Sequence, residues 1–77
     1  MSALKVYSRQ GCHLCEVLIE ELLPLVAGKL ELEVCDIDSN PDWHERWVAD
    51  IPVVEYEDQV VCMHFLDRDA ITGILRG

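Results

Sequence analysis

The sequence is poor in basic residues and has no long hydrophobic run. Six Lys and Arg stand against fifteen Asp and Glu, so the 77 residues carry a formal net charge of −9. This charge repels nucleic-acid phosphates and anionic membrane surfaces, so neither is an expected partner. The densest apolar stretch, Val17–Val26, is interrupted by Glu20, Glu21 and Pro24. It falls short of the ~18 apolar residues of a membrane span. We therefore expect a soluble protein that is not associated with a membrane.

Cysteine is too scarce for a disulfide scaffold, because four in 77 residues is about 5%, against the ~8–10% typical of such proteins. The N-terminus also lacks the pattern of an export signal, since Met1–Tyr7 has one Lys and then alternates at once. A cytoplasmic location is therefore expected, where paired cysteines usually bind metal or do redox chemistry. The length predicts one domain, residues 1–77, and we expect it to act as a monomer.

Hydrophobic periodicity predicts seven elements in the order β-α-β-α-β-β-α. The predicted strands are Ala3–Tyr7, Leu30–Cys35, Pro52–Tyr56 and Val60–Met63, and the predicted helices are His13–Ala27, Pro41–Val48 and a last one capped by Asp67. Proline cannot donate a backbone hydrogen bond, so Pro24 predicts a kink or an early end of the first helix near Glu20–Leu23. In the second strand three apolar residues alternate with Glu31, Glu33 and Cys35, which predicts one buried and one mostly charged face.

The order of the elements predicts an α/β fold. A strand–helix–strand start implies a parallel pair with a right-handed crossover, and the later hairpin adds antiparallel strands. A four-stranded mixed sheet with helices on both faces is the simplest cover for this much apolar surface. We expect Glu55, Glu57 and Asp58 to form a solvated hairpin tip, and Trp43 and Trp47 to serve packing.

A C-x-x-C pair, Cys12 and Cys15, lies where the first predicted strand meets the first helix. Residues i and i+3 of a first turn are neighbours, close enough for a disulfide. A sulfur at a helix N-terminus faces unpaired backbone N–H groups and the positive end of the macrodipole, and both favour the attacking thiolate. This position predicts Cys12 as the nucleophile and Cys15 as the thiol that resolves the mixed disulfide. Cys35 and Cys62 stand apart and are expected to pack.

Two other functions stay open at this point. A structural zinc site needs four ligands, and only Cys62 and His64 are available to complete the C-x-x-C pair, so no metal ligands are predicted. The first alternative is therefore a metal-binding protein, in which Cys12 holds zinc or a thiol-ligated cluster shared between subunits. The other alternative is a non-catalytic binding module in which the cysteines are a passive or regulatory pair.

Three segments resemble short glutaredoxin-like proteins of the thioredoxin fold: Tyr7–Cys15, Glu33–Asp38 and Asp50–Val53, within a similarity that runs from Leu4 to about Leu75. The resemblance implies a thioredoxin/glutaredoxin-like fold and a thiol–disulfide oxidoreductase of cell redox homeostasis. Its partner would be a disulfide-containing protein or a glutathione-mixed disulfide. No tightly bound cofactor is implied, and glutathione would act as reductant or co-substrate.

The resemblance also implies a substrate-binding set beside the catalytic Cys12 and Cys15. This set is Arg9, Gln10, Gly11, His13, Ile51 and Pro52. Pro52 would be a cis-proline beside the cysteine pair, the backbone of Ile51 would pair with the substrate, and Arg9 would meet a glutathione carboxylate. Two departures stand out: His13-Leu14 replaces the usual Pro-Tyr, and Cys62–Phe65 occupies the place of a Gly-Gly pair that helps hold glutathione. Glutathione binding is therefore expected to be weak.

Overall fold

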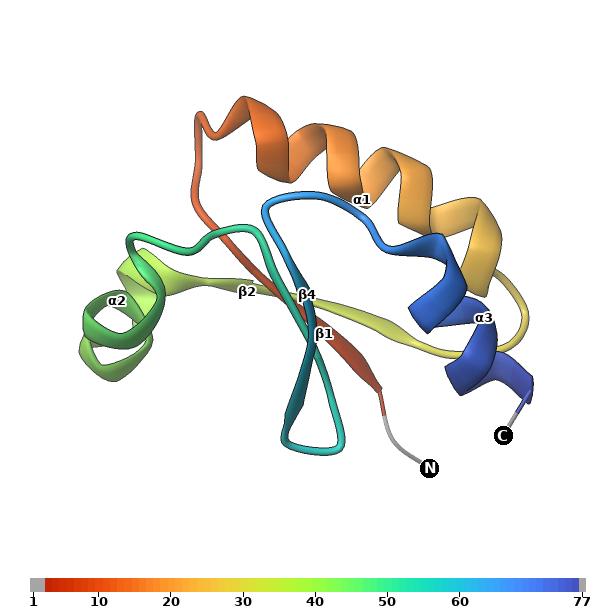
Figure 1. Cartoon of the computed structure of the whole chain (residues 1–77). Coiled ribbons are helices and arrows are strands. Elements are labelled where there is room, and N and C mark those ends of the chain that lie inside the picture. The colour runs from red at the N-terminus through yellow and green to blue at the C-terminus, as the bar shows by residue number, and fades with distance from the viewer. Residues whose placement is uncertain (1–2, 77) are drawn as a thin grey trace.

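The computed structural model describes residues 3–76, so the two ends of the predicted 1–77 domain lie outside the described residues. In chain order the elements are β1 (Leu4–Ser8), α1 (His13–Val26), β2 (Leu32–Asp36), the short 3₁₀ turn η1 (Ile37–Ser39), α2 (Pro41–Trp47), β3 (Val53–Tyr56), β4 (Gln59–Met63) and α3 (Arg68–Arg76). The predicted order is confirmed, with η1 added between β2 and α2 (Figure 1).

The four strands form one mixed sheet in the order β2-β1-β3-β4. β1 runs parallel to β2 and antiparallel to β3, and β3 forms a hairpin with β4. The hairpin turn is Glu57 and Asp58, both left-handed with φ of 49° and 64°. Two left-handed residues give the turn the twist that matches paired strands. The predicted α/β fold with a four-stranded mixed sheet is confirmed.

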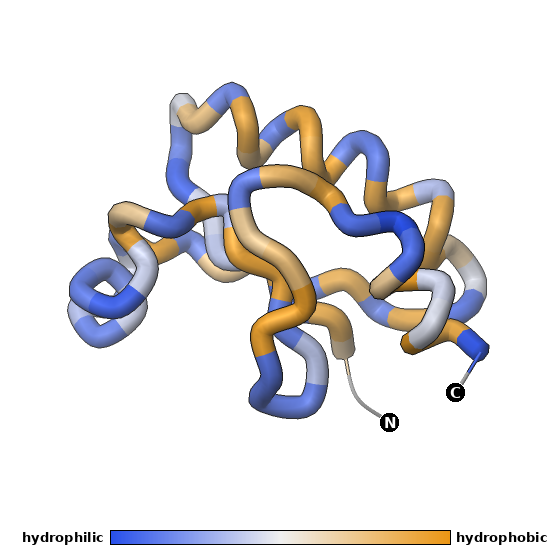
Figure 2. Tube along the Cα trace, in the orientation of Figure 1, coloured by the Kyte–Doolittle hydropathy of each residue, from blue (hydrophilic) through white to orange (hydrophobic). Residues whose placement is uncertain are grey.

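One face of the sheet is covered by α1 and α3, which lie together on that side (Figure 1). Alternation along the strands turns Leu4, Val6 and Val54 to this face, and all three are fully buried. The helices supply the other buried members of this cluster: Leu18, Leu22, Val26 and Ile71. Each such side chain contributes about 1.5–3 kcal/mol of burial free energy. Figure 2 shows the resulting alternation of hydrophobic and hydrophilic residues along α1.

The opposite face carries a second cluster under η1 and α2. Tyr7, its centre, is 4% exposed. Its ring stacks on Trp47 with centroids 5.5 Å apart and meets the edge of Trp43 at 5.6 Å. Cys35 and Val53 are buried in the same cluster. The packing roles predicted for the two tryptophans and for Cys35 are thus confirmed, and helices lie on both faces of the sheet.

α1 does not end early at its proline, so the predicted helix bounds His13–Ala27 are confirmed to within one residue. The helix continues past Pro24 to Val26, and the Ala27 N–H still donates to the Leu23 carbonyl at 3.0 Å. Pro24 has no N–H, so the helix loses the backbone hydrogen bond to the Glu20 carbonyl. Leu22 and Val26, which precede and follow Pro24, are both buried in the core. Tertiary packing holds the last turn. In the described part of the chain no helix combines the length and apolarity needed to cross a membrane.

β2 is an edge strand, and its burial pattern differs from the prediction. Val34 was expected to face the core but is 50% exposed, whereas Cys35 is 4% exposed. The cause is the sheet itself, which is packed on both faces. Cys35 pairs with Tyr7 and is buried in the cluster under η1 and α2. Val34 points to the other face, where it is not among the residues packed with α1 and α3. A single buried face was the wrong assumption for a strand with helices on either side.

Glu55 is buried rather than part of a solvated hairpin tip. It is 8% exposed, and the Tyr7 hydroxyl donates to its Oε1 at 3.0 Å. The turn contains only two residues, so Glu55 lies within β3, opposite Lys5 of β1. Burial, followed by the bond to Glu55, raises the pKa of Tyr7 to about 12. The hydroxyl therefore remains a donor throughout the neutral range.

Candidate active site at the C-terminal edge of β1

Four segments of the chain converge at one edge of the sheet. Tyr7 pairs with both Cys35 and Val53, and Val53 pairs with Met63. The segments that continue past these residues therefore meet at this edge: the 9–12 loop after β1, η1 after β2, residues 51–52 before β3, and residues 64–65 after β4 (Figure 1). Every site residue predicted from the sequence lies in these segments or in the first turn of α1.

Cys12 is the N-cap of α1. Its backbone is extended, with φ −86° and ψ 106°, and its Sγ accepts a hydrogen bond from the Cys15 N–H at 3.3 Å. Its own N–H donates to the Arg9 carbonyl at 3.3 Å, which closes the turn, and the side chain is partly exposed. The cysteine sulfur thus takes the position usually held by a Ser or Asp oxygen.

Cys15 differs from Cys12 in its surroundings. Its side chain is 2% exposed, and both cysteines are free thiols. Burial, with a smaller effect from the neighbouring Cys12 sulfur, raises the pKa of Cys15 to about 12. At neutral pH Cys15 is therefore a protonated thiol behind a partly exposed partner. Cys12 is thus the accessible thiol and Cys15 the buried one, as their order along the helix predicts.

The turn before α1 exposes Gln10, Gly11 and His13 around Cys12. Gly11 has a φ of +78°, a left-handed conformation that side chains rarely adopt, although a Cβ there would meet nothing within 4 Å. Arg9, the first residue of the loop, turns its side chain toward η1. Its Nε donates to Asp38 Oδ2 at 3.0 Å.

Ile51 and Pro52 precede β3, and the peptide bond between them is cis. Pro52 is fully buried. The Ile51 N–H donates to the Trp47 carbonyl at 3.1 Å, so this amide is already engaged within the chain. Of the two backbone polar groups of Ile51, the carbonyl is the one that suits pairing with a substrate.

Two residues of this edge make contacts that the sequence did not indicate. His64 is left-handed, with φ of +66°, and its N–H donates to the Pro52 carbonyl at 2.8 Å. It ties the chain after β4 to Pro52, and Phe65 beside it is 70% exposed. Asp38 of η1 is the partner of Arg9. Neither contact has a local sequence signal, because each joins segments far apart in the chain.

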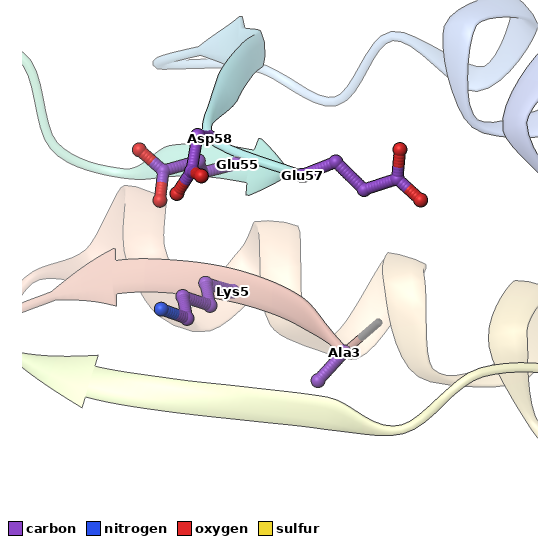
Figure 3. A pocket seen from close by; sticks show the side chains of 5 residues that line it. All are labelled: Ala3, Lys5, Glu55, Glu57 and Asp58. Carbon is purple, nitrogen blue, oxygen red and sulfur yellow. The ribbon is translucent and has the colours of Figure 1, made fainter. Parts of the chain in front are cut away.

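A surface hollow of about 230 Å³ lies elsewhere, lined by Ala3, Lys5, Glu55, Glu57 and Asp58. It adjoins the start of β1 and the β3–β4 turn, at the opposite end of the sheet from the cysteine pair. Figure 3 shows the Glu55 and Asp58 carboxylates together, with Glu57 extending the other way. Among residues 3–76, no three His, Cys, Asp or Glu side chains are grouped so as to hold a metal ion.

Comparison with known proteins matches residues 3–76 to the model of the Glutaredoxin-like domain (DUF836). A glutaredoxin-like protein of Dictyostelium discoideum is 25% identical over 75 residues, covering 88% of this chain and 69% of the relative. The solution NMR structure of a Nitrosomonas europaea protein is 39% identical with a TM-score of 0.82, covering 95% of this chain and 89% of that one. A malarial protein is 13% identical with a TM-score of 0.69, covering 99% and 94%, and supports the fold alone.

Proposed function

The chain belongs to the family of the Glutaredoxin-like domain (DUF836), and on that premise we propose that it is a thiol–disulfide oxidoreductase working through Cys12 and Cys15. One observation carries the proposal. A partly exposed sulfur caps the helix by accepting the N–H of Cys15 in its first turn, and the thiol of Cys15 itself is buried. This arrangement supplies an accessible nucleophile and a protected second thiol, which are the two groups that disulfide exchange needs.

The reaction proceeds in two exchanges. The Cys12 thiolate attacks one sulfur of a substrate disulfide, forming a Cys12 mixed disulfide and expelling the other sulfur as a thiolate. Cys15 then loses its proton to solvent and attacks the Cys12 sulfur, which releases the remaining substrate thiolate. The substrate gains two electrons, and the Cys12–Cys15 pair becomes a disulfide. An external thiol reductant, for which glutathione is a candidate, restores the two thiols.

The substrate is proposed to lie across the edge formed by the 10–13 turn and residues 51–52. Gln10, Gly11 and His13 are exposed there and form the rim around Cys12. The Ile51 carbonyl is proposed as the acceptor for a substrate backbone N–H, since its own N–H is bonded to Trp47. Buried Pro52 supports this segment from beneath. A disulfide in an extended protein segment fits this arrangement, and the protein is proposed to act as a monomer.

Glutathione is proposed to be a weaker partner than a protein disulfide. Left-handed His64 and exposed Phe65 stand where the resemblance places a Gly-Gly pair. Glu16 lies in the first turn of α1, beside the site. We expect turnover of a small glutathione-mixed disulfide to be low. Turnover equal to that of an ordinary glutaredoxin would show that these departures do not affect the site.

The function is tested by replacing each cysteine with serine and measuring the mass of the protein after exposure to a disulfide substrate. Cys15→Ser should accumulate a mixed disulfide, because no adjacent thiol remains to resolve it. Cys12→Ser should form no adduct, and Cys62→Ser is the matched control that should react like the unmodified chain. Adducts on Cys12→Ser but not on Cys15→Ser would reverse the two roles. No reaction in the unmodified chain would leave the passive binding module as the better description.

A further inference from the structure

Arg9 is the cation nearest to the cysteine pair along the chain. It is the only Lys or Arg in the segment from residue 9 to residue 16. Its carbonyl accepts the Cys12 N–H at 3.3 Å, so the backbone of Arg9 is one tight turn away from the nucleophile. Charges within the ~8–10 Å Debye length act on one another even in salt. A free guanidinium here would attract a substrate that carries carboxylates.

The guanidinium is not free, because Asp38 holds it. Arg9 Nε lies 3.0 Å from Asp38 Oδ2, and the two side chains are 44% and 42% exposed. Asp38 is in turn fixed by the 3₁₀ turn, since its N–H donates to Asp36 Oδ1 at 2.9 Å. The Ser39 hydroxyl closes the same turn on the Asp36 carbonyl at 2.6 Å. The other oxygen of Asp38, Oδ1, lies 3.8 Å from His44 Nε2.

Pairing with Asp38 changes the electrostatic character of the site. The positive charge of Arg9 is compensated, Glu16 adds a negative charge in the first turn of α1, and the whole chain carries −9. An incoming carboxylate meets an Arg9 whose Nε is already bonded to Asp38 and whose charge Asp38 compensates, whereas an incoming cation meets no uncompensated positive charge at Arg9. Like-charge approach also slows diffusional encounter.

We infer that Asp38 is a specificity-determining positioning residue, which holds Arg9 and thereby directs the dithiol site toward disulfides on neutral or cationic protein segments and away from carboxylate-bearing ones. The inference rests on the proposed function of Cys12 and Cys15. It adds the charge class of the substrate and names the residue that sets it. Asp38 acts through Arg9 and touches no reacting atom.

The expected size of the effect follows from the exposure of the pair. Exposed ion pairs are worth about 0.2–1 kcal/mol. A free-energy difference of 1.4 kcal/mol corresponds to a factor of ten in rate. Releasing Arg9 should therefore change the ratio of the rates with an anionic and a cationic disulfide by up to about 5-fold. The effect should appear mainly in KM or in the second-order rate constant, because Arg9 governs approach and not the exchange of sulfurs.

The test uses two small disulfides of similar size and opposite charge, cystamine and 3,3′-dithiodipropionate, reacted with the fully reduced protein in single-turnover experiments at low salt. Formation of the Cys12–Cys15 disulfide is the readout, so no external reductant is required. The unmodified chain should react faster with cystamine. Asp38→Asn should raise the rate with dithiodipropionate about 3–5-fold relative to cystamine, a range within the exposed-pair estimate.

Two further variants make the result specific. Asp42→Asn removes an exposed Asp with no contact to Arg9, so it reports the effect of one lost negative charge and should leave the rate ratio nearly unchanged. Arg9→Ala combined with Asp38→Asn should abolish the gain, because the gain requires a released guanidinium. Equal shifts in Asp38→Asn and Asp42→Asn, or a gain that persists without Arg9, would overturn the inference.

The failure of the proposed function gives a different result. If neither disulfide oxidises the cysteine pair of the unmodified chain, the redox function fails and the inference falls with it. If both are reduced at rates that no variant alters, the redox function stands and only the role of Asp38 is refuted. Raising the salt concentration should shrink the rate ratio in the unmodified chain, as screening requires.

Discussion

The high pKa of Cys15 predicts how the second exchange depends on pH. Burial raises that pKa to about 12, with the Cys12 sulfur adding to the shift. Once Cys12 is part of a mixed disulfide its contribution is lost, but burial remains, so the pKa stays above the ~8.5 of an ordinary cysteine. A raised pKa means less thiolate at any pH below it. The resolving step should therefore become faster as the pH rises, through the whole range in which the protein is folded.

The discriminating range is pH 8.5–9.5. A thiol of pKa ~8.5 is half ionised at the start of this range and about 90% ionised at its end, so its rate rises less than about 2-fold. A thiol whose pKa lies well above the range ionises about 10-fold more per pH unit. The two possibilities differ several-fold over one pH unit, which stopped-flow kinetics resolve easily.

A chromogenic disulfide, 5,5′-dithiobis(2-nitrobenzoate), separates the two exchanges. The attack by Cys12 releases one coloured thiolate, and the attack by Cys15 on the mixed disulfide releases the second. A Cys62→Ser background leaves Cys12 as the one cysteine that is not buried, so that both phases are assigned to the Cys12–Cys15 pair. Cys15→Ser on this background should lose the second phase only. A second phase that levels off near pH 8.5 would refute the argument that burial controls Cys15.

Three further predictions concern stability. Leu22→Ala empties a fully buried position and should lower the free energy of unfolding by about 2–5 kcal/mol; a urea titration showing less than ~1 kcal/mol would mean that the core collapses around it. Tyr7→Phe leaves the buried carboxylate of Glu55 without its donor and should cost about 1.5–3 kcal/mol at pH 7. Because the pKa of Tyr7 rises from 10.0 to about 12, its contribution is complete below pH 10 and is lost as the pH rises toward 12, so Tyr7→Phe should flatten this alkaline decline in thermal melts. Asn40→Ala removes the side-chain acceptor of the Asp42 N–H and should cost about 1 kcal/mol, whereas an unchanged midpoint would show that α2 needs no cap.

The order of the elements and the cysteine pair could be predicted from the sequence because their signals are local. Hydrophobic periodicity is read within about ten residues, and the C-x-x-C spacing places both sulfurs on one helical turn. The start of the predicted helix Pro41–Val48 has an equally local signal, since proline suits the first helical position and Asn40 before it is the N-cap of α2.

The contacts that tune the site could not be predicted, because they join distant segments. The Tyr7–Glu55 bond spans 48 positions and the Arg9–Asp38 pair spans 29. Both carboxylates, Glu55 and Asp38, have the sequence context of a solvated loop. Each finds its hydrogen-bond partner only when the sheet brings two distant segments together. The early end that Pro24 allows on local grounds does not occur, because the core beneath the helix holds its last turn.

The N-cap of α1 has a consequence for the oxidised protein. One atom, Cys12 Sγ, both accepts the Cys15 N–H and carries the electrons that the proposed reaction transfers. A sulfur in a disulfide is neutral and accepts a hydrogen bond less well than a thiolate. Oxidation therefore weakens the cap, and by thermodynamic linkage a firmer first turn favours the reduced pair. Exchange of the Cys15 amide hydrogen thus becomes a direct reporter of the redox state, because its protection depends on the hydrogen bond that Cys12 Sγ accepts.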